Sequence, residues 1–515
     1  MSGIEWRSGP ELDLARPRTL ADLCAAAQAR AADAIVLRDG AHTATWAQLS
    51  AWSATLAYHW RDLVAPGQRV VIIAPNSLAH LLVELACWRL AAMAAPLCAE
   101  QGLSRLSAAI ERLRPVLVVT AAALANVIPQ PVAYCDLDTV LTLASHGPGL
   151  PWRPAEPDTP CLILHTSGSC GEARGVVLSH DNLCSQQAAF ATIWPEVGPG
   201  DRLAAYLPWH HSFGSLAERL WSLCRGAELT IIPGGGRDRE QVLATVAAVR
   251  PTLLMSVPKM HRTLTQAGVL NATTLRWAFT AGATMGVDEE RWYAEHGIAV
   301  YEGWGLTETS PSAVITQPGS RRIPGIVGTP IPGVAVGVAD DGNIFIAGPG
   351  VMQAYADLPA ATARIRQFHP TYGWVLDSGD LGAWTPDGLR LIGRADQVVK
   401  LANGEKVALA RIVEHLERGP IRHAVVFVRD DQLIALVYAA AEHADEAILA
   451  TVAHANHQAE AAFTRVQAVY RLTRRVSCDN GLLTPAHKVA RSVWLAAFDD
   501  GQTFRLVSGA RVAEA

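Results

Sequence analysis

The sequence predicts an α/β protein in two parts. Residues 1–395 are expected to form a large N-terminal domain of two helix-covered α/β subdomains and a β-barrel-like subdomain, and residues 396–515 a small α+β domain. Strand-like and helix-like runs alternate from Thr45 onward, short strands with turn residues replace them from about Gly325, and the pattern changes again near Gly393. A length of 515 residues also exceeds what one compact core holds.

The alternation of predicted helices and strands begins in the N-terminal third of the chain. Three segments carry apolar residues at helical spacing, at 45–62, 78–92 and 108–113. Pro75-Asn76-Ser77 is expected to cap the second of them. Buried strands are expected at 69–73 and 116–120. Because strands and helices alternate, we expect a parallel sheet that helices cover.

The pattern continues after a loop at 147–154. Strands are expected at 161–164, 176–178, 202–207, 228–232, 253–257 and 277–280, and helices after Ser179 and at 239–249. Beyond Gly325, turns such as Asp340-Asp341-Gly342 between short strands favour an antiparallel, barrel-like unit. The last part has the size of a small α+β domain, with helices at 412–417 and 446–463 and strands at 424–428 and 434–439.

Composition and charge exclude several classes of protein. With 50% hydrophobic and 18% charged residues the chain is globular, and a net charge of −5 gives no electrostatic footprint for nucleic acid. The nine cysteines are scattered and form no CxxC pair, which argues against a disulfide framework or a zinc site and for a reducing cytoplasm. No signal peptide and no membrane span are expected, because the N-terminus lacks an apolar stretch and no apolar run reaches about 18 residues.

The stretch at 164–180 has the most unusual local pattern. Glycines at 168, 171 and 175 let the backbone aim successive N–H groups at one anion. Hydroxyls of Thr166, Ser167 and Ser169 and the charge of Arg174 suit phosphate oxygens. The spacing does not match a Walker loop. From these residues alone, a phosphate loop and a mobile Gly/Ser hairpin both stay open.

Eight motifs then follow one another in a fixed order. They are HTSGSCGEARGVVLSHDN, LPWHHSFG, AGA, YEGWGLTETSP, GTPIPGV, GWVLDSGDLG, LIGRADQVVKLANGEKV and NGLLTPAHKVAR. Together they resemble the adenylate-forming superfamily of AMP-dependent acyl-CoA synthetases and related ligases, over Thr45 to Arg491. The wording of YEGWGLTET and NGLLTPAHK is most similar to the long-chain fatty acyl-CoA synthetases of that superfamily.

The resemblance implies a two-step reaction. A carboxylate attacks the α-phosphorus of ATP to give an acyl adenylate and pyrophosphate, and a thiol then displaces AMP. ATP and Mg²⁺ are therefore the expected cofactors, with CoA or a carrier-protein phosphopantetheine as the thiol. Cations, aligned donors and a metal are needed because an anion must approach a polyanion.

The resemblance also assigns the phosphate loop. It implies that the β- and γ-phosphates are held by Thr166, Ser167, Gly168, Ser169, Gly171 and Arg174. This copy departs from the usual pattern, with Cys170 where threonine is common, Ala173 where proline is common and Arg174 where lysine is common. Arg174 keeps the charge but replaces a mobile ammonium with a planar fork. Cys170 is either a reactive thiol or a small residue that fills the place of a hydroxyl.

Further positions are assigned by the other motifs. His211 matches a histidine near the acyl-binding wall, where Trp209 and Phe213 either line the acyl tunnel or pack in the core. Gly282 and Ala283 match a turn beside adenine, and Trp304 stands where tyrosine commonly stacks on adenine. Thr307 is expected near the α-phosphate. Glu308 is the expected magnesium ligand, since a hard carboxylate suits this cation, although a lone Glu in such a loop is more often only solvated.

The C-terminal motifs complete the expected site. Asp380 matches the aspartate that accepts hydrogen bonds from both ribose hydroxyls, and Arg394 is expected at the ribose or phosphate. Asp396 matches the hinge about which the small, mobile domain swings, and Gly404 belongs to the loop that lines the pantetheine tunnel. Lys488 matches the lysine that bridges the acyl carboxylate and α-phosphate; the alternative is one more charge in a basic segment at 471–491.

The leading hypothesis is a cytoplasmic, ATP- and magnesium-dependent ligase that makes an acyl-CoA thioester, from a medium- to long-chain fatty acid. One rival loads the acyl group onto an acyl carrier protein. Another is a degenerate member that binds nucleotide as a sensor or scaffold, which the substituted phosphate loop motivates. The sequence does not define the acid or the oligomeric state.

Overall fold

The computed structural model describes residues 3–166, 174–283, 285–320, 322–323, 325–400, 406–429, 432–459, 464–478, 480–484, 489–501 and 503–508. Several predicted site residues lie outside the described residues, namely Ser167, Gly168, Ser169, Gly171, Gly404 and Lys488, as does Cys170. Within the described ranges, no helix is long and apolar enough to cross a membrane.

The first sheet has seven strands in the order β19-β9-β8-β5-β4-β6-β7. Their bounds are β4 Arg69–Ile73, β5 Met93–Pro96, β6 Leu117–Thr120, β7 Ala133–Asp136, β8 Pro160–Thr166, β9 Arg174–Ser179 and β19 Ala354–Tyr355. The strands from β8 to β7 pair in parallel, as the alternation predicts, whereas β9 runs antiparallel to β8 and β19 antiparallel to β9. The expected phosphate loop therefore connects two antiparallel strands, and Thr166 pairs with Arg174 across its ends.

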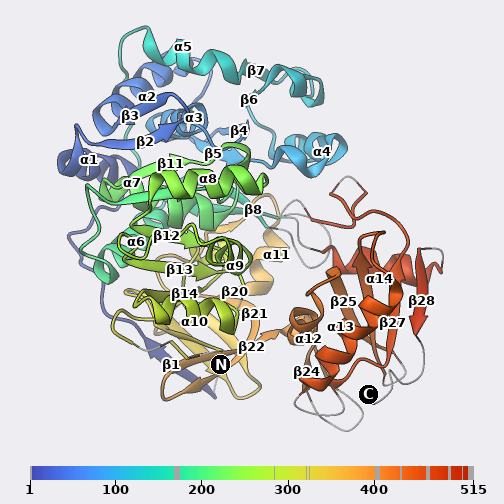
Figure 1. The fold of residues 1–515 in the computed structure, drawn as a ribbon. Helices are drawn as coiled ribbons and strands as arrows, with labels where there is room; N and C mark the ends of the chain where they lie inside the picture. The colour runs from blue at the N-terminus through green and yellow to red at the C-terminus, as the bar shows by residue number, and fades with distance from the viewer. Residues whose placement is uncertain are drawn as a thin grey trace.

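A second sheet has four strands in the order β10-β11-β2-β3. Their bounds are β2 Ile35–Asp39, β3 His42–Thr45, β10 Arg202–Ala205 and β11 Glu228–Ile231. Helix α3 (Leu78–Arg89) contacts β2 of this sheet and both β4 and β5 of the first, and all twelve of its residues are buried. Most of these residues are apolar, and the three polar ones, His80, Glu84 and Arg89, make hydrogen bonds, so α3 can lie buried at the centre of the two α/β units (Figure 1).

The remaining helices of this half cover the sheets. They are α1 Leu20–Ala31, α2 Trp46–Trp60, α4 Leu103–Leu113, α5 Val140–Ser145, α6 His180–Ile193, α7 Trp221–Arg225, α8 Arg239–Val249, α9 Pro258–Gln266, α10 Val287–Glu295 and α11 Pro359–Ile365. Side chains at the N-caps define several starts. Ser77 caps α3, Thr45 and Gln48 form a capping box on α2, and Ser179 and Asn182 form another on α6.

The third sheet has 11 strands, with the order β1-β17-β18-β21-β22-β16-β15-β14-β13-β12 and β20 paired to β21. The bounds are β1 Ile4–Ser8, β12 Leu253–Ser256, β13 Trp277–Ala281, β14 Ala299–Trp304, β15 Val314–Ile315, β16 Ile326–Pro330, β17 Ala335–Ala339, β18 Asn343–Ala347, β20 Arg366–His369, β21 Gly373–Thr385 and β22 Gly388–Arg394. The antiparallel strands expected after Gly325 are present. They continue the parallel strands β12 to β14 in one open sheet, without closing into a separate barrel among the described strands.

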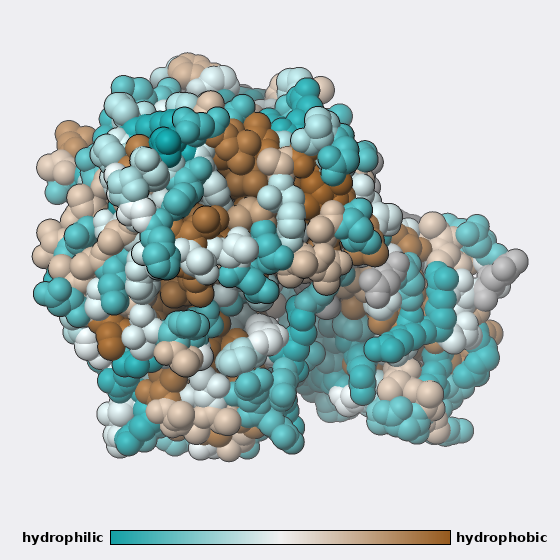
Figure 2. All heavy atoms as spheres, turned by 90° about the horizontal axis from the view of Figure 1, so that it is seen from above, coloured by the Kyte–Doolittle hydropathy of each residue, from teal (hydrophilic) through white to brown (hydrophobic). Residues whose placement is uncertain are grey.

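The C-terminal elements gather to one side of the molecule, on the right in Figures 1 and 2. They are β23 Val398–Lys400, β24 Lys406–Ala408, α12 Leu409–Leu416, β25 Ile421–Arg429, β26 Gln432–Ala439, α13 Asp445–His457, β27 Ala468–Leu472, α14 Arg491–Asp499 and β28 Phe504–Ser508. Two apolar clusters, one around Val426 and one around Trp494, pack on the sheet β25-β26-β27-β28. The division at 395/396 stays a prediction.

Candidate active site

The carboxyl ends of β13 and β14 form one wall of the candidate site. These strands pair in parallel, with Ala281 opposite Gly303, so the residues that follow them emerge at the same edge of the sheet. Gly282 comes directly after β13 with φ +85°, a conformation that side chains disfavour. Trp304 ends β14. The predicted adenine turn and the predicted stacking residue therefore leave the sheet side by side.

Asp380 lies against Trp304 although 76 positions separate them in the chain. The indole Nε1 of Trp304 donates a hydrogen bond to Asp380 Oδ2 at 3.0 Å, and Arg394 Nη1 lies 3.2 Å from Asp380 Oδ1. Asp380 is only 8% exposed. Burial raises the pKa of its carboxyl, whereas Arg394 and the indole donor lower it. The protein thus supplies a donor to each carboxylate oxygen.

The sheet register explains this arrangement. Asp380 in β21 pairs directly with Arg394 in β22. Gly379 precedes Asp380 with φ +67°, and a Cβ there would meet Arg394 Nη2 at 3.0 Å, so glycine suits both the backbone and the guanidinium. Arg394 also donates to the Ser378 carbonyl at 3.0 Å, and its Nε lies 3.7 Å from the exposed Asp396 carboxylate. Arg394 therefore links the predicted ribose aspartate with the predicted hinge aspartate.

Glu308 lies on the short 3₁₀ turn at Thr307–Thr309 that follows β14. Its Oε1 accepts a hydrogen bond of 2.6 Å from the hydroxyl of Tyr355 in β19. The guanidinium carbon of Arg174 lies 5.3 Å from the centre of the Tyr355 ring. Burial and Glu308 raise the pKa of the Tyr355 hydroxyl, so this group is a neutral donor at physiological pH. The structure thus joins the end of the phosphate loop to the predicted metal ligand.

Thr307 contacts the LPWHHSFG segment. Its hydroxyl lies 3.1 Å from the Ser212 hydroxyl, next to the half-buried His211. His210 and His211 rings lie 4.5 Å apart. A Cβ at Gly214 would meet the Pro208 carbonyl oxygen at 2.4 Å, so only glycine allows the chain to turn back here. This turn brings His211 and Thr307 to the same region.

Trp209 packs in the core, which was one of its two sequence-based interpretations. It is 0% exposed, the Arg219 guanidinium lies 4.7 Å from its ring centre, and the His80 ring meets it edge-on at 5.4 Å. Arg219 in turn pairs with Glu84 at 2.5 Å on α3. Phe213 is only partly buried and meets Phe279 edge-on at 5.7 Å. Of the two aromatic residues beside the histidines, Phe213 is thus the one with exposed surface.

The profile of the AMP-binding enzyme family matches residues 24–356 of the chain. The chain belongs to this family. Membership confirms the resemblance to adenylate-forming enzymes, and it confirms an enzyme of the AMP-forming acid–thiol ligase type at the level of the family. The matched range contains the whole phosphate loop, Trp304, Glu308 and Tyr355.

Individual relatives are similar over much of the chain. Feruloyl-CoA synthase of an Amycolatopsis species is 28% identical over 411 residues, 74% of this chain and 80% of that protein. Long-chain-fatty-acid–CoA ligase FadD15 of Mycobacterium bovis is 27% identical over 325 residues, 53% of this chain and 52% of that protein. The crystal structure of ATP-bound MatB from Rhodopseudomonas palustris is 24% identical, covers 93% of this chain and 99% of its own, and has a TM-score of 0.76. The last similarity confirms the α/β fold.

The residues of this AMP-binding enzyme fit a magnesium ion that substrate phosphates also coordinate. Mg²⁺ commonly takes one or two carboxylates together with phosphates and waters. Glu308 offers one such carboxylate, and among the described residues its Oε2 accepts no hydrogen bond. In the same part of the chain, no group of three or more His, Cys, Asp or Glu side chains is arranged to hold a metal ion. A site that protein ligands complete by themselves is therefore not found there.

Sequence reasoning missed Tyr355 and Ser212. Tyr355 reaches the site because β19 adds to the edge of β9, with Tyr355 opposite Val176. The loop before it is anchored by a hydrogen bond of 2.8 Å from the Met352 amide to the Glu308 carbonyl. No local pattern around Tyr355 signals this pairing. Ser212 stands inside the LPWHHSFG motif, so its position beside His211 could have drawn attention to it.

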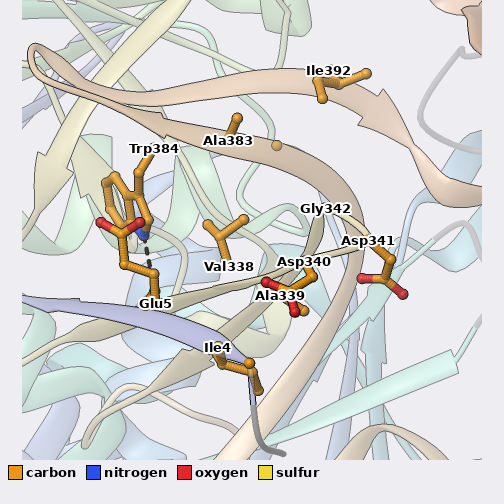
Figure 3. Close-up of a pocket in the computed structure, with 12 residues that line it drawn as sticks. Ile4, Glu5, Val338, Ala339, Asp340, Asp341, Gly342, Ala383, Trp384 and Ile392 are labelled. Carbon is orange, nitrogen blue, oxygen red and sulfur yellow. Dashed lines mark hydrogen bonds between the residues drawn. The ribbon is translucent and has the colours of Figure 1, made fainter.

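A separate groove lies on the same 11-stranded sheet. Its volume is about 690 Å³, and Glu5, Asp340 and Trp384 are among the residues that line it (Figure 3). The Trp384 indole Nε1 donates to the Glu5 carbonyl at 3.1 Å. None of the predicted site residues lines this groove, although β21 carries both Trp384 and Asp380.

Proposed function

We propose that the chain is an ATP-dependent ligase that joins a carboxylic acid to AMP and then transfers the acyl group to the thiol of CoA. One observation carries the proposal. In a chain of the AMP-binding family, the buried Asp380 with its two donors, the Thr307–Glu308 turn and Arg174 meet along the carboxyl edge of β13 and β14. These groups match the ribose, metal and phosphate contacts that adenylate formation requires.

The proposed reaction has two steps, and the first needs positive charge near the phosphates. In the first step a carboxylate oxygen forms a bond to the α-phosphorus of ATP, and the bond to pyrophosphate breaks. Arg174 offsets phosphate charge at one end of the loop, while Lys488 is proposed to lie between the two reacting anions. A magnesium ion at Glu308 would supply further positive charge on the phosphates. In the second step the thiol sulfur bonds to the acyl carbon and AMP leaves.

The nucleoside contacts follow from the described geometry. Asp380 is proposed to accept hydrogen bonds from the ribose hydroxyls while Trp304 and Arg394 hold its carboxylate in place. Gly282 and Ala283 are proposed to run beside the adenine. We further propose that residues 396–515 move about Asp396 between the two steps, bringing first Lys488 and then Gly404 to the site.

The acid belongs to this proposal as well. We propose a medium- to long-chain fatty acid, on the wording of YEGWGLTET and NGLLTPAHK and on the similarity to FadD15. An aromatic acid is the second candidate. The partly buried Phe213 beside His211, where we propose the acyl wall, supports it because its ring could pack on an aromatic acid, together with the similarity to feruloyl-CoA synthase.

The acceptor and the location are also proposed. CoA is the first acceptor and an acyl carrier protein the alternative. A cytoplasmic location rests on the nine scattered cysteines.

Pyrophosphate exchange over a panel of acids tests the proposal. The panel contains saturated fatty acids of increasing length, ferulate and benzoate, each with ATP and Mg²⁺. Exchange that depends on one class of acid supports the ligase and names the acid. The product is then offered CoA or holo-carrier protein, and a CoA thioester without carrier loading removes the carrier alternative. Exchange with no acid would instead favour a nucleotide-binding sensor.

A further inference from the structure

A cavity of about 270 Å³ lies among α1, α2, the C-terminal end of α3 and the loop at Trp152. None of the candidate active-site residues lines it. Its walls include the apolar side chains of Cys24, Trp46 and Leu85, and Trp152 closes one side. The volume is near the lower end of known ligand pockets, which begin at about 300 Å³. Space of this size suits a small organic molecule.

A buried arginine lines this cavity without a counter-ion. Arg89 is only 6% exposed. Its Nε donates to Ser53 Oγ at 3.0 Å, and its Nη2 donates to Ser50 Oγ at 2.8 Å and to the Ser50 carbonyl at 3.0 Å. Nη1 donates to no acceptor among the described residues, and no Asp or Glu described there pairs with Arg89. A buried charge is costly unless it is paired, so an anion in the cavity would supply what the protein does not.

The surroundings of Arg89 define the chemistry of that anion. The nearby Cys24 thiol cannot balance the charge, because burial raises its pKa to about 12 and it stays neutral. The Arg89 guanidinium lies 4.7 Å from the centre of the Trp152 ring. The ring therefore covers one face of the guanidinium, and the edge of the guanidinium is left for a ligand. Apolar walls beside one guanidinium fit a molecule with a single charge and an apolar body.

We propose that this cavity binds a small organic carboxylate, whose charged group pairs with Nη1 of Arg89 and whose apolar body packs against Trp46 and Leu85. The site is separate from the proposed active site and does not depend on the proposed function. Arg89 is the last residue of α3, the helix that also carries His80 and Glu84.

Titration calorimetry with benzoate on the full chain tests this site. The wild type is expected to bind benzoate, and benzamide and acetate are expected to bind at least ~10-fold more weakly, because one lacks the charge and the other the apolar body. Arg89→Gln should weaken benzoate binding at least ~10-fold. Arg225→Gln is the matched control, because Arg225 likewise donates to uncharged acceptors, here the backbone carbonyls of Val197 and Pro195, but lies outside the cavity.

A second pair of variants keeps the test decisive if Arg89→Gln does not fold. Ala25 and Ala26 are neighbouring exposed residues of α1, and only Ala25 lines the cavity. Ala25→Trp should therefore block benzoate and Ala26→Trp should not. In crystals soaked with 4-bromobenzoate, the anomalous bromine peak is expected beside Trp46 and Leu85. Wild-type affinity in Ala25→Trp, no binding to the wild type, or a bromine peak only beside His211 would overturn the proposal.

Discussion

The carboxylates at the two ends of the candidate site differ in burial and in the hydrogen-bond donors that they receive. At the nucleoside end, Asp380 is buried and receives one protein donor on each oxygen, from Trp304 and from Arg394. At the phosphate end, Glu308 is half-buried and, within the described part of the chain, receives one neutral donor, the Tyr355 hydroxyl. The described residues thus offer a donor to each oxygen of Asp380 and to one oxygen of Glu308.

The difference suits the two kinds of group that we propose for these two ends, the ribose and the phosphates with Mg²⁺. Ribose hydroxyls are neutral, so a preorganised carboxylate with fixed orientation serves them best. Phosphates with Mg²⁺ carry charge, and a carboxylate with an available oxygen is needed to share the cation. We therefore expect mutations at the nucleoside end to change the binding of ATP. Mutations at the phosphate end are expected to change the rate of the first step.

Lys488→Ala tests whether one charge from the C-terminal part serves the first step only. Acyl-adenylate formation is expected to fall by about 10³-fold, because the reacting anions would lose the cation that we propose lies between them. Thioester formation from supplied acyl adenylate should be largely spared. The two half-reactions are measured separately, by pyrophosphate exchange and by thioester release. Equal losses in both would contradict this role.

Glu308→Gln tests the phosphate end. The amide keeps the shape but removes the charge, and the exchange rate is expected to fall by about 10²-fold with a higher Mg²⁺ requirement. Tyr355→Phe is the control, since it removes the hydrogen bond to Glu308 and leaves the carboxylate. A Glu308→Gln enzyme with an unchanged magnesium dependence would rule out Glu308 as the metal ligand.

Asp380→Asn tests the nucleoside end. The KM for ATP is expected to rise ~30-fold with a smaller change in kcat, because hydrogen bonds to a charged group are lost. Asp377→Asn is a neighbouring control, since Asp377 caps its own turn through the Gly379 amide at 2.9 Å. A loss confined to kcat would contradict the assignment of ATP binding to the nucleoside end.

Trp304→Phe tests one of the two donors to Asp380 at the nucleoside end. It removes the indole donor to Asp380 and is expected to raise the KM for ATP ~10-fold. The donor stabilises the charged carboxylate, so its loss raises the pKa of Asp380 further above its usual range. The acidic limb of kcat/KM for ATP should therefore move to higher pH. Trp277→Phe, which alters a tryptophan of β13, is the control. An unchanged acidic limb in Trp304→Phe would contradict the role of Trp304 as a donor that stabilises the charged Asp380.

Arg174→Lys is expected to have the smallest effect, less than ~3-fold on the exchange rate. Lysine keeps the charge at the end of the loop, and only the planar fork is lost. A collapse of ATP turnover would show that the guanidinium geometry beside Tyr355 matters as much as its charge.

Apolar periodicity and capping residues in the sequence predicted several helices and strands correctly. The helix expected at 239–249 is α8 with the same bounds, and the expected caps at Ser77 and Ser179 are present. The strand expected to reach Leu207 ends at Ala205, because the chain turns back closely against Gly214. The helix expected to begin at 446 is α13, which ends at His457 instead of reaching 463.

The partners within the site could not be predicted in the same way. The bond between Trp304 and Asp380 depends on the order of strands from β14 to β21, and the bond between Tyr355 and Glu308 on an edge strand of another sheet. Motif order brought Trp304, Glu308, Asp380 and Arg394 onto one list of candidates. Only the pairing of distant strands shows which of them touch.

Direct detection of the acyl adenylate tests the account most directly. The wild-type enzyme is incubated with ATP, Mg²⁺ and the acid that supports exchange, without thiol, and the products are identified by mass spectrometry. The account predicts acyl-AMP and pyrophosphate, and the acyl-AMP should be consumed when CoA is added. Formation of ADP and phosphate, or a thioester without any acyl-AMP, would contradict it.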